Sequence, residues 1–218
     1  STSAVNITNV TAGSALTVTG NTAAVDIQHK NAGLTGTSDS VSIAMTGNTG
    51  GLTVDSDGGQ DIESATITAT GINSGSLVIG DQAASTITSL TLGGAGSLTI
   101  GGGDLATLTS LDASTNSGGV TYTTQVTAEA VSLTGGSGND TLTGNTGDDV
   151  IQGGAGNDTL SLGGAGGDDH IDGGAGDDAI TVAGVTKDDT ITGGEGTDTL
   201  TINTALSYSA TTGVNQAA

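Results

Sequence analysis

The same carboxylate returns seven times in a nine-residue repeat that runs from residue 135 to residue 201. Position 1 of the repeat is Gly and position 6 is Asp in every copy. Ca²⁺ takes six to eight oxygen ligands, at about 2.3–2.6 Å, from carboxylates and backbone carbonyls. The spacing therefore predicts Ca²⁺ sites whose carboxylates come from Asp140, Asp149, Asp158, Asp169, Asp178, Asp189 and Asp198.

The copies alternate in kind along the chain. Position 2 is Gly in every odd copy and in no even copy, whereas position 5 is Asp in every even copy. The true period is therefore a pair of copies, and we expect odd and even copies to lie on opposite sides of the structure. On this basis Asp140 should share an ion with Asp158, which is the next odd copy, and Asp149 should pair with Asp169.

The fourth copy has two possible registers. If it begins at Gly163, then Asp168 is the ligand, whereas a start at Gly164 assigns that role to Asp169. We prefer Asp169 because it keeps the apolar Ile171 two residues further on. The acidic residues at position 5 are expected to be solvated.

The elements that must position these carboxylates follow from the rest of the repeat. The first six residues, Gly-Gly-x-Gly-x-Asp, predict a turn because Gly tolerates positive φ and close backbone approach. The last three predict a short strand whose central side chain points inward. Two copies then make one coil of about 18 residues, and stacked coils form parallel strands. The inward residues at position 8 are Leu142, Ile151, Leu160, Ile171, Ile180, Ile191 and Leu200.

This core is too thin to fold the segment by itself. Each buried Leu or Ile contributes at most about 1.5–3 kcal/mol, while ordering each residue costs about 1–2 kcal/mol. The stacked aspartates also repel one another, so we expect folding to require a cation between neighbouring turns. The odd column has three such gaps and the even column two, which predicts about five Ca²⁺ ions. The turn carbonyls assigned as further ligands are those of Gly135, Gly144, Gly153, Gly164, Gly173, Gly193, Ser137, Ala155 and Ala175.

Other metals fit this pattern less well. Mg²⁺ prefers rigid octahedral geometry with retained waters, and Zn²⁺ would need Cys or clustered His. Lys187 stands where the sixth copy should have Gly, which places an ammonium in a turn built for a cation. The gap between Asp169 and Asp189 is therefore the one most at odds with the pattern.

Residues 1–134 are rich in Thr, Ser, Ala and Gly and carry short alternating stretches. Alternation of apolar and polar residues between Gly, Asn and Asp predicts strands and turns. The spacing fits either a β-solenoid or a β-sandwich and does not separate them. Helix signals are weak. The predicted strands are residues 16–20, 41–45, 65–70, 76–80, 90–94, 97–101, 120–124 and 131–135.

The composition excludes several classes of function. The formal net charge is −21 and the only cationic residues are Lys30 and Lys187, which argues against binding nucleic acid. There is no Cys, so neither a disulfide nor a thiolate contributes. No apolar run approaches the roughly 18 residues of a transmembrane helix. No catalytic motif is present, and we expect a protein that is not an enzyme.

The seven Gly-Gly-x-Gly-x-Asp-x-U-x copies, in which U is apolar, resemble the RTX family of secreted bacterial proteins. Residues 86–114 are similar to Thr/Ser/Gly-rich β repeats of bacterial surface-layer (S-layer) proteins. The resemblance implies an all-β fold: a Ca²⁺-loaded parallel β-roll at 135–201, preceded by the β region 1–134 and followed by a cap or linker at 202–218. It further implies type I secretion, a location on the bacterial cell surface and self-association into a homo-oligomeric lattice. It also allows contact with a cell-surface glycan.

Two other functions remain open. One is an adhesin or ice-binding module, and the other is the non-catalytic tail of a secreted enzyme. Ice binding would need a regular ladder of outward Thr or Asn, and position 3 of the repeat does not provide one. Residues 1–134 show no protease or lipase site, so the tail hypothesis requires an enzyme domain outside the chain.

Overall fold

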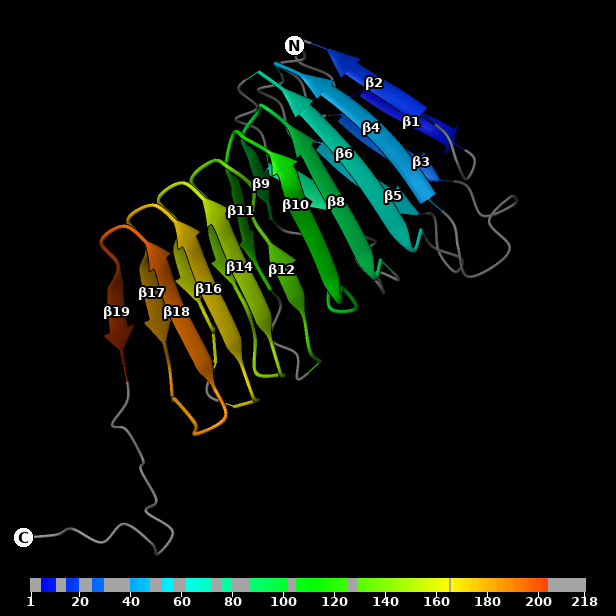
Figure 1. The fold of residues 1–218 in the computed structure, drawn as a ribbon. Coiled ribbons are helices and arrows are strands. Elements are labelled where there is room, and N and C mark those ends of the chain that lie inside the picture. Colours follow the sequence, from blue (N-terminus) through cyan, green and yellow to red (C-terminus); the bar gives the residue numbers. More distant parts are fainter. Residues whose placement is uncertain are drawn as a thin grey trace, which may run out of the picture.

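The two long sheets of this protein contain only parallel strands. The computed structural model describes residues 5–10, 15–19, 25–29, 40–47, 52–56, 62–71, 76–79, 87–101, 105–124, 129–164 and 166–203. Within these ranges every element is a strand or a turn, and none is a helix long and apolar enough to cross a membrane. The chain passes from one sheet to the other at each turn, so it winds as a solenoid (Figure 1).

The odd-numbered strands form one sheet, which we call the odd sheet, and the even-numbered strands form the even sheet. The odd sheet consists of β1 (Val5–Val10), β3 (Val25–His29), β5 (Leu52–Ser56), β7 (Ser76–Ile79), β9 (Leu98–Ile100), β11 (Val120–Thr123), β13 (Thr141–Thr143), β15 (Thr159–Ser161), β17 (Ala179–Val182) and β19 (Thr199–Ile202). The even sheet consists of β2 (Ala15–Thr19), β4 (Ser40–Thr46), β6 (Ser64–Thr70), β8 (Ser89–Gly94), β10 (Ser110–Asn116), β12 (Ser132–Thr134), β14 (Val150–Ala155), β16 (His170–Ala175) and β18 (Thr190–Glu195).

The alternating stretches of residues 1–134 are strands of the same solenoid as the repeat. All eight predicted strands are present, as β2, β4, β6, β7, β8, β9, β11 and β12. The sandwich alternative is wrong, because β12 pairs in parallel with β10 on one side and with β14 on the other. Both sheets therefore run without interruption across residue 134.

A single apolar core lies between the two sheets. In the even sheet, pairing aligns one buried column whose members are at most 1% exposed: Leu90, Leu111, Leu133, Ile151 and Ile171. The predicted inward residues Leu142 and Leu160 are fully buried in the odd sheet. Leu200 is 49% exposed, contrary to the prediction, because it lies in β19, the last strand of the odd sheet.

The strands of the repeat differ in length between the two sheets. The three-residue prediction holds for β13 and β15 but is wrong for β14, β16 and β18, which have six residues each. These longer strands continue through the Gly-Gly-x of the next odd copy, where Gly154 pairs with Gly174. The glycines there keep the ladder hydrogen bonds although they lack the side chains that favour strands.

Candidate metal centre

The aspartates of the odd copies form one column along the odd sheet. Strands β13, β15, β17 and β19 pair in register, and each is preceded by its position-6 Asp. The backbone amide of Asp140 donates to Oδ1 of Asp158 at 2.7 Å, and that of Asp158 donates to Oδ1 of Asp178 at 2.8 Å. The amide of Asp178 donates in the same way to Asp198 at 3.0 Å. The predicted adjacency of Asp140 and Asp158 is therefore present.

The even copies form a second column on the other sheet. Asp149 donates its backbone amide to Oδ1 of Asp169 at 2.9 Å, and Asp169 donates to Oδ1 of Asp189 at 2.9 Å. Asp169 is 4% exposed, whereas Asp168 is an exposed turn residue. In the fourth copy, Asp169 and not Asp168 is therefore in register with the other aspartates of the even column. The odd and even copies lie on opposite sheets, as their alternation in sequence predicts.

Burial makes the charged form of these carboxylates costly. Asp140, Asp149 and Asp158 are each 1% exposed. Desolvation is the largest influence and raises the pKa of Asp158 to about 7, with the neighbouring carboxylates of Asp140 and Asp178 adding to the rise. Desolvation likewise raises the pKa of Asp169 to about 6. A column of such groups favours either protonation or a bound cation.

Two buried carboxylate oxygens of the odd column have no hydrogen-bond partner and lie near backbone carbonyl oxygens. Among the described residues, Asp158 Oδ2 and Asp178 Oδ2 are buried and have no hydrogen-bond partner. A Cβ placed on Gly153 would collide with Asp158 Oδ2 and with the carbonyl oxygen of Gly173. A Cβ on Gly173 would meet Asp178 Oδ2 and the carbonyl oxygen of Gly193 in the same way. Carboxylate and carbonyl oxygens therefore converge where only glycine fits.

This donor set matches a hard cation such as Ca²⁺. No group of three or more His, Asp or Glu side chains in the described part of the chain is placed to hold a metal ion. A cation in either column would therefore need oxygen ligands other than these side chains, and the turn carbonyls are the predicted source. Ca²⁺ accepts that mixture, whereas Zn²⁺ favours side-chain nitrogen and sulfur.

The predicted carbonyl ligands do not all share this geometry. Gly135 and Gly144 resemble Gly153, because a Cβ on either would meet the Oδ2 of the Asp in its own copy. Gly164 differs, since its Cβ would meet Thr146 and the Asn145 carbonyl instead. The role of the Gly164 carbonyl as a ligand remains a prediction.

Of the position-3 residues, Ser137 lies in a turn, whereas Ala155 and Ala175 end strands β14 and β16. The carbonyl of Ala175 accepts a hydrogen bond from the Gly156 amide at 2.8 Å, which leaves one lone pair for another partner. The amides of Ser137 and Ala155 donate to carbonyls of the preceding coil. Their role as ligands remains a prediction.

Both columns begin against an apolar coil. Strand pairing places Val120 in the position-6 register ahead of Asp140, and Val131 ahead of Asp149. The amide of Val120 donates to Asp140 Oδ1 at 2.6 Å, and that of Gly136 donates to Asp140 Oδ2 at 2.7 Å. The first carboxylate of the odd column is therefore held by backbone amides on both oxygens, unlike Asp158 and Asp178.

A second ladder, which the sequence reasoning missed, runs beside the odd column. Position-5 side chains accept hydrogen bonds from the next coil: Asn139 Oδ1 from the Asn157 amide at 2.9 Å, and Asn157 Oδ1 from the Asp177 amide at 3.1 Å. In the even copies, Asp148 Oδ1 accepts from the Asp168 amide at 3.0 Å. Position 5 is Asn or Asp in six of the seven copies, and this restriction in the sequence indicates a shared hydrogen-bonding role. These residues are exposed, as expected, and also tie neighbouring coils together.

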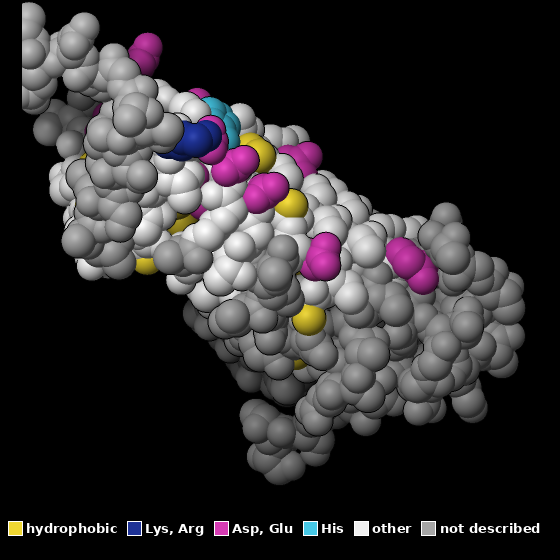
Figure 2. All heavy atoms as spheres, turned by 90° about the horizontal axis from the view of Figure 1, so that it is seen from below, with side chains coloured by type: hydrophobic (Ala, Val, Ile, Leu, Met, Phe, Trp, Pro, Cys, Tyr) yellow, Lys and Arg dark blue, Asp and Glu magenta, His cyan; other side chains and the backbone are white. Residues whose placement is uncertain are grey.

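Exposed acidic side chains follow one another along the face that carries the even-copy turns (Figure 2).

Lys187 does not enter the cation site as its position suggested. Its ammonium pairs with Asp188 at the surface, where the Lys187 side chain is 83% exposed. In the sixth copy, Oδ2 of Asp189 accepts a hydrogen bond at 2.6 Å from the backbone amide of Thr186, the residue at position 3. In the first two copies, Oδ2 of the position-6 Asp accepts instead from the backbone amide of the residue at position 2.

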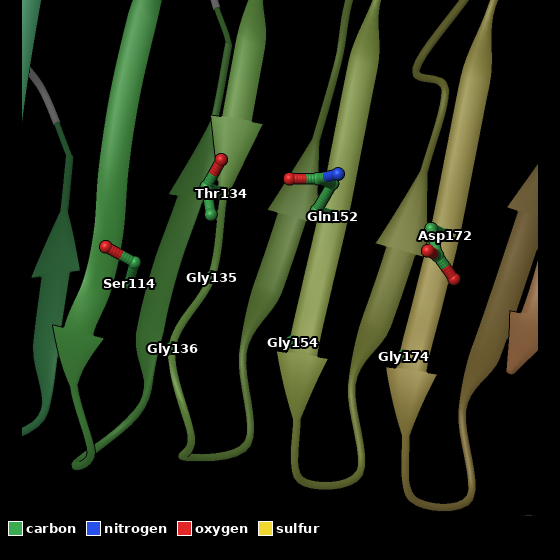
Figure 3. A pocket seen from close by; sticks show the side chains of 8 residues that line it. All are labelled: Ser114, Thr134, Gly135, Gly136, Gln152, Gly154, Asp172 and Gly174. Carbon is green, nitrogen blue, oxygen red and sulfur yellow. The ribbon is translucent and has the colours of Figure 1, made fainter. Parts of the chain in front are cut away.

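A shallow groove of about 380 Å³ lies on the outer face of the even sheet. The side chains of Thr134, Gln152 and Asp172 follow one another on successive strands beside a row of glycines (Figure 3). A Cβ on Gly154 would collide with the backbone of Gly136, and Gly154 has φ +106°. The contact between coils thus accounts for these glycines without a ligand.

Comparison with known proteins agrees with this geometry. Residues 134–165, 164–184 and 181–201 match the family model of the RTX calcium-binding nonapeptide repeat, which confirms the RTX resemblance for about a third of the chain. No curated protein and no solved structure shows a significant match.

Proposed function

From the premise that residues 134–201 are RTX calcium-binding repeats, we propose that this chain is a structural, extracellular Ca²⁺-binding segment of a bacterial surface-layer protein. It folds and assembles into a lattice when Ca²⁺ binds. The observation that carries the binding part is the pair of buried, unpartnered oxygens, Asp158 Oδ2 and Asp178 Oδ2, beside converging carbonyls.

Each ion lies between two turns of the same column. The Asp of one coil and the Asp of the next supply carboxylate oxygens, and the position-1 and position-3 carbonyls complete the sphere. Three ions occupy the odd column, between Asp140 and Asp198, and two occupy the even column, between Asp149 and Asp189. The ions neutralise the charge of the stacked carboxylates, while the chain supplies one position-6 carboxylate per copy of the repeat.

Ca²⁺ then decides whether the repeat is folded. Extracellular modules bind with dissociation constants of about 10⁻⁴–10⁻³ M. At ten times that concentration each site adds about 1.4 kcal/mol, so five sites together add about 7 kcal/mol. That sum equals the whole stability of an ordinary domain, about 5–15 kcal/mol. The segment is thus unfolded at cytosolic Ca²⁺ and folds after export.

A structural role fits the rest of the chain. RTX repeats are typically non-catalytic modules of secreted or extracellular proteins. The continuous solenoid gives a stiff rod without a catalytic motif, and its net charge of −21 would keep copies apart until cations bind. A cell-surface glycan would be a further partner of such a layer.

Electron microscopy with and without Ca²⁺ tests the proposed layer. We expect ordered two-dimensional sheets in millimolar Ca²⁺ and none in excess chelator, with Mg²⁺ at equal concentration as the control. A chain that stays monomeric at high concentration in millimolar Ca²⁺ contradicts the surface-layer proposal. Thermal hysteresis in that monomeric sample would favour the ice-binding alternative instead.

A further inference from the structure

The first coil of the repeat is joined to the coil before it by hydrogen bonds within the chain. This first repeat coil comprises residues 135–152, and β10 and β11 precede it. On its even side the backbone amide of Val131 donates to Oδ1 of Asp149 at 3.1 Å, and the amide of Asn145 donates to Oδ2 at 2.7 Å. Both oxygens of Asp149 are therefore held by amides, as those of Asp140 are on the odd side.

The side chain of Asn145 adds a second connection to the preceding coil. Asn145 is 4% exposed, its Nδ2 donates to the carbonyl of Glu129 at 2.9 Å, and its Oδ1 accepts from the amide of Gly147 at 2.6 Å. The later even copies have Ala165 and Val185 at this position. Neither of those side chains can form a hydrogen bond, so the sequence provides this connection in the first repeat coil alone.

The coil that accepts these bonds has no position-6 aspartate of its own. Val120 and Val131 stand in that register, and they are 1% and 4% exposed. The hydroxyl of Thr124, directly after β11, donates to the carbonyl of Thr143 at 2.9 Å and also to that of Gly144. This coil therefore has no buried position-6 carboxylate for a cation to neutralise. We call it the template coil and define it as β10, β11, Thr124, Glu129 and Val131.

The two ends of the repeat differ in what lies next to them. Tyr122 of the template coil pairs with Leu142 of the first repeat coil, and both are at most 2% exposed. At the other end Leu200 and Ile202 are 49% and 38% exposed, and their strand β19 is the last of the odd sheet. Each coil of a solenoid contacts only its neighbours. Among the described residues, the template coil is thus the neighbour on which a repeat coil can bury apolar surface at once.

The coils further along the repeat bury oxygens that the chain leaves unsatisfied. Oδ1 of Asp158 accepts from the Asp140 amide, but Oδ2 of Asp158 is buried without a partner, and so is Oδ2 of Asp178. Leaving a buried polar atom unpaired is costly. The need for a cation is therefore smallest at the first repeat coil and greater at the coils that follow.

We propose that Ca²⁺-driven folding of the repeat starts on the template coil and proceeds coil by coil toward Asp198, with Asn145 as the positioning residue that holds the first repeat coil there. This inference rests on the proposed Ca²⁺ binding and assigns its direction. The first repeat coil still needs Ca²⁺, because its other side gains a neighbour only when an ion neutralises Asp158. It folds at the lowest Ca²⁺ concentration, and the last repeat coil, residues 184–201, folds at the highest.

Hydrogen–deuterium exchange of the full chain along a series of Ca²⁺ concentrations tests the direction. We expect residues 135–152 to reach half of their final protection at a lower Ca²⁺ concentration than residues 184–201. The reverse order, or one common midpoint for both segments, overturns the inference while Ca²⁺-driven folding stands. If neither segment gains protection in Ca²⁺, the proposed Ca²⁺ binding fails as well.

Asn145→Ala tests the positioning role in the same measurement. The midpoints of residues 135–152 and 184–201 should both rise about twofold, because a roughly fivefold loss from one hydrogen bond is shared between the ions of the two first gaps. Loss of protection in both segments, with β8 to β11 still protected, agrees with the same role. A shift confined to residues 135–152 indicates a purely local contact and overturns the assignment, as does the absence of any shift.

Asn157→Ala is the matched control, because it also removes one side-chain hydrogen bond between coils. Oδ1 of Asn157 accepts from the amide of Asp177 at 3.1 Å, one coil further from the template coil. Folding that starts on the template coil reaches this contact only after the first repeat coil has formed. Asn157→Ala should therefore raise the midpoint of residues 184–201 and leave that of residues 135–152 unchanged. A raised midpoint for residues 135–152 in this control would contradict the proposed direction.

Discussion

The backbone amide of Asp140 donates a hydrogen bond at 2.7 Å to Oδ1 of Asp158, which lies 18 residues later in the next odd coil. One oxygen of Asp158 thus fastens two coils together, while the other, Oδ2, is buried without a partner. The same side chain can therefore hold the register of the solenoid and offer an oxygen to a cation.

Replacing Asp158 should remove ions from both gaps that it borders. Asp158→Asn keeps an Oδ1 acceptor for the Asp140 amide but removes the negative charge. We expect the Ca²⁺ stoichiometry, measured by isothermal titration calorimetry, to fall by about two of the five predicted ions, since ligand charge sets affinity in such sites.

Asp177→Asn is the matched control for that variant. Asp177 is exposed, and its Oδ1 accepts a hydrogen bond at 2.8 Å from the backbone amide of Thr197. The Oδ1 of Asn157 accepts in the same way from the backbone amide of Asp177. An amide should serve equally well there, with stability changing by less than about 0.5 kcal/mol. If Asp158→Asn binds as many ions as Asp177→Asn, the position-6 carboxylates are not the ligands.

A methyl group at position 1 should block the cation cradle. Gly153→Ala would push a Cβ against Asp158 Oδ2 and the Gly173 carbonyl. Overpacking of this kind costs about 1–3 kcal/mol, and we expect a lower melting temperature in Ca²⁺ together with weaker binding. Ala155→Ser is the control, because Ser137 holds the equivalent position in the first copy. Undiminished affinity in Gly153→Ala would show that Gly153 does not border a site.

Much of this site was predictable because the repeat is periodic. The parity of positions 2 and 5 correctly placed odd and even copies on opposite sheets. The spacing of Ile171 correctly placed Asp169 in the register of the even column, and its role as a ligand remains a prediction. Residues 1–134 were harder, because alternation shows which residues face a core but not which strand is the neighbour. Solenoid and sandwich therefore stayed open until the parallel pairing of β12 was seen.

Other features depended on contacts that no local pattern contains. The six-residue length of β14 arises because Gly154 lies against its neighbour in the next coil. The position-5 ladder depends on the distance between coils.

Acidification should stabilise the repeat when Ca²⁺ is removed. The pKa of Asp158 is raised to about 7 and that of Asp169 to about 6 in the folded chain, against about 3.9 for an unfolded Asp. The folded state therefore binds more protons between pH 7 and pH 4, and its stability rises as the pH falls through that window. Above pH 7 both carboxyl groups are charged in the folded and the unfolded state. The cost of burying these charges then lowers the stability of the folded state to the full extent.

Circular dichroism in chelator between pH 8 and pH 5 would measure this effect as a gain of β structure on acidification. Asp158→Asn should show a flatter dependence, because it lacks one of the titrating groups. With Ca²⁺ present the trend should reverse, since protons compete with the ion for the carboxylates. Stability in chelator that falls on acidification would contradict the assigned burial of the column.

Hydrogen–deuterium exchange of the full chain, resolved by peptide, tests the central claim that Ca²⁺ folds the repeat. In excess chelator at pH 8 we predict that amides of residues 135–201 exchange at unprotected rates, and that millimolar Ca²⁺ but not Mg²⁺ restores their protection. The strands β8 to β11, which lie outside the repeat, serve as the internal reference. Residues 135–201 that remained protected in excess chelator would contradict the account.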